Sequence, residues 1–170
     1  MRCKECKEKF EPRWFNQKFC MVNDQCIRRF AEQTKLKAWK EKKKKLKEGL
    51  QTKSDYIKIL QILVNKYIRI RDKGKPCISC QKEIKGKTDA GHYFSVGGYP
   101  SVRFDERNIH AQCINCNQFN GGNLIPYREN LLKLIGNDEF EHLTELAHQN
   151  RQFTIDEIKE MIKHYKEKVK

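Results

Sequence analysis

Eight cysteines occur in the 170-residue chain in two groups of four, and their spacing is typical of metal ligands. In the central group, Cys77 and Cys80 form one CxxC pair, and Cys113 and Cys116 form a second. Each CxxC turn presents two thiolates at the separation that a tetrahedral zinc ion requires. The central group therefore predicts a structural zinc, because a redox CxxC would need a βαβ context that the surrounding sequence lacks.

The N-terminal cysteine group has a regular first half and a wide second half. Cys3 and Cys6 form a CxxC pair, whereas five residues separate Cys20 from Cys26. A segment this short holds too few apolar residues to fold without a cross-link such as a bound metal ion. We expect a second structural zinc here. The alternative is an incomplete group in which Cys26 begins a helix without binding metal.

The segment between the two central pairs contains a pattern of polar residues. His92 lies in the run DAGHY, Asn108 lies five residues before the second CxxC, and Asn117 directly follows it. This order resembles the ββα-metal site of HNH nucleases. Asn117 replaces the final His of the usual pattern. The same departure occurs in the Holliday-junction resolvase endonuclease seven of phage T4, in which two CxxC pairs also bracket the site.

A more specific resemblance covers most of the chain. The run DAGHY, the segment RFDERNIHAQCINCNQFNGGNLIPYRENL and the N-terminal cysteines are similar to the NinG family of lambdoid phages, also called Rap. Members of this family are recombination endonucleases that cut branched DNA. The resemblance therefore implies a DNA endonuclease that acts on Holliday junctions or D-loops.

The resemblance also implies roles for individual side chains. His92 would be the general base, since a neutral imidazole with a pKa near ~6.5 can take a proton from water at physiological pH. Asn108 would hold the hairpin and orient His92. A catalytic Mg²⁺, or Mn²⁺, would bind to Asp89 and Asn117, because hard cations prefer oxygen ligands.

The second ligand of this ion has an alternative. HNH enzymes usually place Asp or His directly before the base, and Gly91 stands at that position. Asp89 shares the strand face of Gly91 and is the preferred ligand. His110 is the runner-up as a ligand or phosphate contact, and a structural role suits it equally well. Candidate substrate contacts, of which the two arginines could equally be surface residues, are Tyr93, Arg103, Arg107, Asn120 and Asn123.

The formal net charge of +14 is confined to the first half of the chain. Residues 1–75 hold 23 Lys and Arg against 9 Asp and Glu, while residues 76–170 hold 13 of each class. The segment from Ile27 to Lys53 contains Arg28, Arg29 and the run Lys42, Lys43, Lys44 and Lys45. Such a segment binds nucleic acid by releasing counterions condensed on the phosphates. The alternative is a solvated helix face that only aids solubility.

Five helices are expected around the cysteine-rich segment. A basic helix runs from Ile27 to about Leu50, and a second helix begins at Ser54 or Asp55 and reaches Asp72. The second helix has a wide apolar stripe that could be a dimer interface or the core of a monomer. Three more helices cover residues 127–135, 139–148 and 155–169, the last with a Thr154–Glu157 capping box.

The fold class that follows is α+β. We expect a small zinc-stabilised ββα-metal core, similar to that of HNH enzymes, over residues 76–125. An N-terminal zinc knuckle over residues 1–26 precedes it, followed by the basic and apolar helices of residues 27–75. The C-terminal helices of residues 126–170 complete the chain.

The expected function is metal-dependent, structure-selective cleavage of branched DNA by a homodimer, because symmetric cutting of a junction needs two active sites. No segment has the roughly 20 consecutive apolar residues that cross a bilayer, and no secretory signal is evident, so we expect a cytoplasmic protein without a membrane partner. The alternatives are a general HNH-type nuclease that nicks any duplex and a non-catalytic double-zinc DNA-binding protein.

Overall fold

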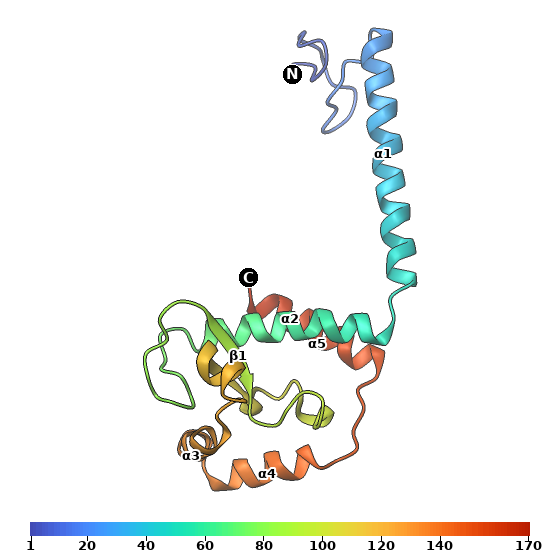
Figure 1. Ribbon diagram of the computed structural model, residues 1–170. Coiled ribbons are helices and arrows are strands. Elements are labelled where there is room, and N and C mark those ends of the chain that lie inside the picture. The colour runs from blue at the N-terminus through green and yellow to red at the C-terminus, as the bar shows by residue number, and fades with distance from the viewer. The chain divides into compact units, whose positions relative to one another are not determined.

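The computed structural model describes residues 1–170, apart from the side chains of Lys47 and Glu48. The chain divides into two compact units, Met1–Gln51 and Thr52–Lys170 (Figure 1). This division crosses the predicted segment 27–75, because the basic helix belongs to the first unit and the apolar helix to the second. The mixture of helices with a two-stranded sheet confirms the α+β class.

The first unit consists of an irregular cysteine-rich segment and one long helix, α1 (Asp24–Gly49). Asn23 caps this helix, since its Oδ1 accepts the N–H of Cys26 at 2.9 Å, so the helix begins three residues before the expected Ile27. The ring of Phe30 contacts Trp14 and Phe19. Beyond Phe30, every residue of α1 with a described side chain is exposed, over a helix about 39 Å long at ~1.5 Å per residue.

A two-stranded hairpin lies at the centre of the second unit. Strand β1 (Thr88–His92) pairs antiparallel with β2 (Ile109–Cys113), with Asp89 opposite Gln112 and Gly91 opposite His110. Because opposed residues share a face, one face carries these four residues. The other face carries Ala90, His92, Ile109 and Ala111. A π-helix, η3 (Asn115–Phe119), follows β2.

Helix α2 (Lys53–Arg71) covers the face that carries Ala90 and Ile109, and α5 (Ile155–Lys168) packs against α2 (Figure 1). They bury one apolar core, whose members are Leu60, Val64, Ile68, Phe104, Ile109, Ile158, Ile162 and Tyr165. The α2 stripe is thus largely covered inside its own unit, although Ile62 and Ile70 stay exposed. This packing favours the monomer-core interpretation of the stripe, and the homodimer stays a prediction.

The starts of α2 and α5 are set by capping boxes. Thr52 caps α2, because its hydroxyl accepts the N–H of Asp55 while the Asp55 carboxylate accepts the N–H of Thr52. The expected start at Ser54 or Asp55 was therefore wrong by two to three residues, since Asp55 occupies the third helical position and not the cap. The predicted box between Thr154 and Glu157 is confirmed at α5.

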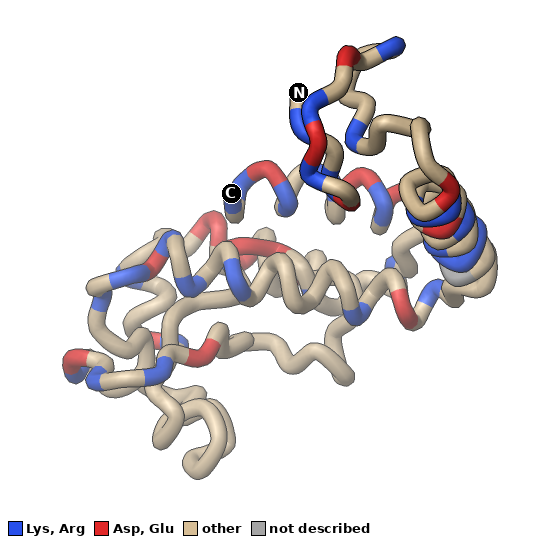
Figure 2. The backbone as a smooth tube through the Cα atoms, turned by 90° about the horizontal axis from the view of Figure 1, so that it is seen from above, with Lys and Arg blue, Asp and Glu red and all other residues tan. Residues whose placement is uncertain are grey.

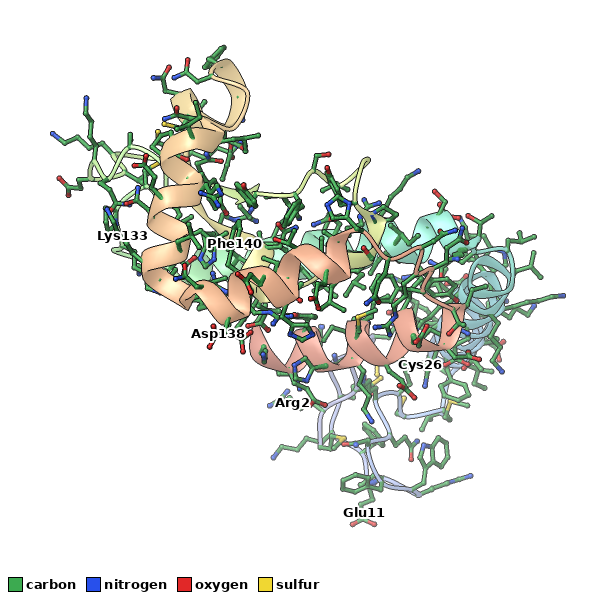
Figure 3. The ribbon with its side chains drawn as sticks, turned by 90° about the horizontal axis from the view of Figure 1, so that it is seen from below. Arg2, Glu11, Cys26, Lys133, Asp138 and Phe140 are labelled. Carbon is green, nitrogen blue, oxygen red and sulfur yellow. The ribbon has the colours of Figure 1, made fainter. Side chains whose placement is uncertain are left out.

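Helices α3 (Leu124–Ile135) and α4 (Asn137–Ala147) form a second core with the loops beside the hairpin. Tyr127 is fully buried and donates its hydroxyl proton to the carbonyl of Gly91 at 3.0 Å. Phe140, labelled in Figure 3, places its ring 5.5 Å from that of Tyr93. Gly136, with φ of 83°, alone separates the two helices, so α4 begins two residues earlier than expected.

A buried ion pair fastens the end of α2 to strand β2. Asp72, 3% exposed, accepts hydrogen bonds from Arg71, Lys75 and the N–H of Ala111. Arg71 also donates to the carbonyls of Ile109 and Glu106. Burial opposes the charge of Asp72, but these donors lower its pKa to about 2.

Among the described residues, no helix combines the length and apolar character that crossing a membrane requires.

Substitution of Asp72 by alanine is expected to lower the free energy of unfolding by about 3 kcal/mol, because the Arg71 charge would be left without its partner. Urea unfolding followed by circular dichroism measures the change. The control is Asp156→Ala, which removes a carboxylate whose side chain is 92% exposed. An equally small effect of both substitutions would show that the pair does not hold α2 on the hairpin.

Candidate active site and metal centres

The central cysteine group is assembled as the sequence predicts. The Sγ atoms of Cys77, Cys80, Cys113 and Cys116 lie within 4.8 Å of one another, and those of Cys80 and Cys113 are 3.9 Å apart. A tetrahedral zinc with Zn–S bonds of about 2.3 Å separates its sulfur atoms by about 3.8 Å. Since all four are free thiols, the group can hold one tetrahedral ion.

Backbone and side-chain donors surround these sulfur atoms. The N–H groups of Cys113 and Cys116 donate to Cys77 Sγ and Cys113 Sγ, both at 3.4 Å, and Asn123 Nδ2 donates to Cys116 Sγ at 3.6 Å. Burial opposes the thiolate of Cys77, but amide donors, led by that of Cys113, outweigh it and lower the pKa of this thiol below 9.0. These donors thus favour the metal-binding thiolate of Cys77, whereas burial raises the pKa of Cys80 and raises that of Cys116 to about 12.

The N-terminal group also meets, despite its wide second pair. Cys3 Sγ lies 3.6 Å from Cys26 Sγ, and Cys6 Sγ lies 3.7 Å from Cys20 Sγ. Cys26 reaches the group from the first turn of α1, which is why five residues can separate it from Cys20. All four sulfur atoms lie within 4.8 Å of one another, so this group can hold a second tetrahedral ion.

The two predicted ligands of a catalytic cation lie side by side. Asn117, in the π-helix, donates from Nδ2 to Asp89 Oδ2 at 3.1 Å, and Gln118 donates to the same oxygen at 2.6 Å. Lys87 Nζ lies 3.9 Å from the other carboxylate oxygen. The Asp89 side chain is only 13% exposed, so amide dipoles and one ammonium group replace most of its water. A π-turn of this kind often occurs at functional sites.

His92 ends strand β1 on the face opposite Asp89. Its Nε2–H donates to the carbonyl of Arg103 at 3.1 Å, because a carbonyl oxygen can only accept. The neutral ring therefore carries its lone pair on Nδ1. Burial lowers the pKa of His92 below the usual 6.5, although the carbonyls of Arg103 and Ala90 act in the opposite direction. The ring is thus neutral at physiological pH.

Asn108 is fully buried directly before β2. Its Oδ1 accepts the N–H of Phe94 at 2.7 Å, and its Nδ2 donates to the carbonyls of Phe94 and Val102, each at 3.0 Å. Its own carbonyl accepts the N–H of Tyr93. These bonds hold the backbone of Tyr93 and Phe94, which follow His92, as expected for a residue that positions His92.

His110 is held inside the ion-pair network and is 6% exposed. Its Nε2–H donates to the carbonyl of Arg107 at 3.0 Å, and its Nδ1 accepts from Arg71 at 3.1 Å. Burial, assisted by the charge of Arg71, lowers its pKa to about 4. Both ring nitrogens are engaged, so the geometry favours the structural alternative over the runner-up role as metal ligand.

Most of the candidate substrate contacts have structural partners. Arg107 bonds Asp105 and Glu139, and Arg103 donates from Nε to Gln61 at 2.8 Å. Tyr93 packs in an aromatic cluster with Phe94, Tyr99, Tyr127 and Phe140. Asn123 adopts a left-handed conformation, with φ of 47°, and bonds Cys116. Asn120 is exposed beside the π-helix.

The predicted DNA-binding residues all lie on α1, along which Lys and Arg recur (Figure 2). Arg28 and Lys42 to Lys45 are exposed. Lys43 Nζ lies 5.0 Å from the Trp39 ring centroid. Arg29 is exposed but lies 3.6 Å from Glu5 and 3.3 Å from Glu32, which partly offset its charge. The helix therefore presents a basic surface available to phosphates.

Two glutamines near Asp89 were missed by the sequence reasoning. Gln118 donates to Asp89, and Gln112 is fully buried opposite Asp89 in the hairpin. The sequence did contain a signal for Gln112, because a polar residue two positions after His110 in a strand must share the face of His110. No comparable signal identifies Gln118, whose contact depends on the π-turn.

The sequence as a whole matches one family of phage proteins. The family model described as Bacteriophage Lambda NinG protein matches residues 1–170. The chain belongs to the NinG family. It is 38% identical to protein ninG of Escherichia phage lambda over 190 residues, which cover 99% of this chain and 91% of that protein. Protein ninG of Escherichia phage 933W is 37% identical over 185 residues, which cover 99% and 92% of the two chains.

Family membership confirms the resemblance inferred from the cysteines and the DAGHY segment. Protein ninG of Salmonella phage P22 is also 38% identical over 190 residues, with 99% of this NinG chain and 92% of the relative covered. No solved structure matches the chain significantly. The names of these relatives state no activity, so the chemistry of this NinG protein rests on the geometry of its site.

Proposed function

We propose that this NinG protein is a metal-dependent DNA endonuclease that cuts branched recombination intermediates, such as Holliday junctions and D-loops, by phosphodiester hydrolysis. The observation that carries the proposal is the pairing of Asp89 with Asn117, which are 28 residues apart in sequence and 3.1 Å apart in space. His92 ends the strand that holds Asp89, and the central cysteine group joins the segments that carry both.

The donor set of the pair suits a hard divalent cation. Asp89 offers carboxylate oxygens and Asn117 an amide oxygen, which are ligands that Mg²⁺ and Mn²⁺ prefer. Rotation of the Asn117 amide would present Oδ1 where Nδ2 now donates to Asp89. Bound there, the ion would polarise the scissile phosphate and help the 3′ oxygen to leave. The central cysteine group would hold a structural zinc that keeps the hairpin and π-helix in place, and the N-terminal group would hold a second structural zinc.

His92 supplies the base in this proposal. The Arg103 carbonyl fixes the Nε2–H tautomer, so Nδ1 can accept a proton from the attacking water. Asp89 and His92 are three residues apart, about 10 Å along the strand. Because the two side chains lie on opposite faces of the hairpin, the scissile phosphate would reach both at the edge of β1. Asn108 holds the backbone after His92 and takes no proton.

The basic helix α1 would hold DNA by its phosphates, which gives affinity without reading sequence. The predicted catalytic half, residues 76–170, carries no net charge, so its affinity for DNA would depend on α1. The preference for branched DNA comes from the family resemblance. Symmetric cutting of a junction requires two active sites, and hence a homodimer.

The substrate class is tested with a four-way junction and a linear duplex of the same arm sequence, each incubated with Mg²⁺ and the zinc-loaded protein. Preferential cutting at the branch point is expected. Equal cutting of both DNAs would favour the alternative of a general HNH-type nicking nuclease. Binding of both DNAs without cutting either would favour a non-catalytic double-zinc DNA-binding protein.

Neutralising Lys42 to Lys45 with glutamine is expected to weaken DNA binding and reduce its salt dependence. On duplex DNA the logarithmic salt slope should become shallower by about 0.9 for each phosphate that the variant no longer neutralises. Fluorescence anisotropy over a range of NaCl concentrations measures the slope. The matched control neutralises four exposed lysines of the second unit, Lys159, Lys163, Lys166 and Lys170. Equal slopes for wild type and the α1 variant would show that the four lysines do not contact phosphates and only aid solubility.

A further inference from the structure

The side chain of Gln112 leaves one buried oxygen without a partner. Gln112 is fully buried, and its Nε2 donates to Ser79 Oγ at 2.7 Å and to the carbonyl of Gly122. A carbonyl can only accept, so the amide nitrogen must face Gly122 and the amide oxygen must face the other way. Among the described residues, Gln112 Oε1 is the one buried side-chain nitrogen or oxygen without a hydrogen bond.

This oxygen occupies the space in front of Gly91. A Cβ atom at position 91 would overlap Gln112 Oε1 and would lie 2.9 Å from its Cδ. Gly91 does not have a positive φ, so its backbone conformation is open to any residue. The glycine is therefore needed for space, because any side chain there would displace the amide oxygen. Gly91 directly precedes His92, the proposed base.

Gln112 and Asp89 share one face of the hairpin. They are directly opposed in the antiparallel register, which places their Cβ atoms about 5 Å apart. Asp89 in turn contacts Asn117. Oxygen donors thus lie on one side of the hairpin on β1, on β2 and on the π-helix, and the oxygen of Gln112 lies against Gly91.

We propose that Gln112 Oε1 is the third protein oxygen for the divalent cation of the Asp89–Asn117 pair. It takes the place that a side chain at position 91 would fill, and it extends the cation site along this face from Asp89 to Gly91. A buried amide oxygen without a donor is suited to a cation, because an ion supplies the interaction that the protein does not. This inference rests on the proposed function, since it assumes the Asp89–Asn117 site.

The test is Mn²⁺ binding to the zinc-loaded protein, followed by electron paramagnetic resonance of free Mn²⁺ and requiring no DNA or cleavage. Gln112→Ala should weaken binding by about tenfold or more, the loss typical when a partner of a metal site is removed. Gln152→Ala is the control, because it removes an exposed amide far from Asp89 in sequence and outside the site, and it should leave the affinity within about twofold. Zinc content and the melting temperature without Mn²⁺ report on folding.

A reciprocal pair of variants separates ligation from packing. Gly91→Asp alone should disturb the hairpin, because the new side chain overlaps Gln112. Gly91→Asp combined with Gln112→Ala should fold and recover Mn²⁺ binding, since a carboxylate then fills the vacated space. If Gln112→Ala loses zinc, Gln112→Met keeps the volume without the oxygen and should show the same loss of Mn²⁺ affinity.

Two failures can be told apart. If wild type binds Mn²⁺, Asp89→Asn abolishes binding and the Gln112 variants bind as wild type, the inference about Gln112 is overturned and the Asp89–Asn117 site stands. If folded, zinc-loaded wild type binds no Mn²⁺ outside its cysteine groups, the site itself and the inference built on it both fall.

Discussion

Replacing His92 with alanine is expected to lower the rate of DNA cleavage by about 10²–10⁴-fold, the range typical for loss of a general base. The Nε2–H bond to Arg103 fixes the tautomer with a lone pair on Nδ1, and burial keeps the ring neutral at physiological pH. Single-turnover cleavage of a labelled four-way junction measures the chemical step without product release.

His164→Ala is the matched control for this loss, because His164 is exposed on α5 and faces Tyr165. It should leave the cleavage rate unchanged. The His92 variant should keep wild-type DNA affinity and zinc content, which separates loss of chemistry from loss of fold. Wild-type cleavage by the His92 variant would remove this residue from the mechanism.

Replacing Cys77 with serine is expected to remove one zinc per chain and to unfold the hairpin region. A serine hydroxyl is a poor zinc ligand, and structural zinc contributes about 10–16 kcal/mol to the folding of small zinc domains. Cys77 is fully buried, and the N–H of the next residue, Ile78, donates to the carbonyl of Ala111 in β2. Metal analysis by mass spectrometry and thermal unfolding measure both effects.

The matched substitution in the other cysteine group is Cys20→Ser. It should also remove one zinc, but the second unit should keep its melting transition because its own group of four cysteines is intact. DNA binding by this variant should weaken, since the first unit carries α1. A Cys77 variant that retains two zinc ions and the wild-type transition would show that the central group does not bind zinc.

The sequence predicted which residues meet in the cysteine groups, and that Asp89 lies near Asn117, better than it predicted what surrounds them. CxxC spacing identified the whole central group and the first half of the N-terminal group, because two thiolates in one turn have few other uses in such a chain. The prediction of Asn117 as a ligand followed from a family pattern, and that of Asp89 followed from the alternation of side chains along a strand. The oxygen of Gln112 and the amide of Gln118 needed the strand register and the π-turn, which no periodicity in the sequence specifies.

The first residues of the helices were also only partly predictable from the sequence. The boxes at Thr52 and Thr154 are built alike, yet only the second was recognised from sequence. Ser54 and Asp55, two equally good capping residues, lie inside α2 and obscure Thr52. The role of His110 also depends on tertiary contacts, because Arg71 approaches its ring from a helix 39 residues earlier in the chain.

The most direct test of the central claim measures junction cleavage by the zinc-loaded protein as Mg²⁺ is added, with Asp89→Asn alongside. Asp156→Asn serves as the control for a carboxylate exposed to solvent. The expected result is no cleavage without Mg²⁺, a rate that rises and saturates as Mg²⁺ is added, and loss of that rise in the Asp89 variant. Cleavage without Mg²⁺, or a wild-type Mg²⁺ response in Asp89→Asn, would contradict the proposed active site.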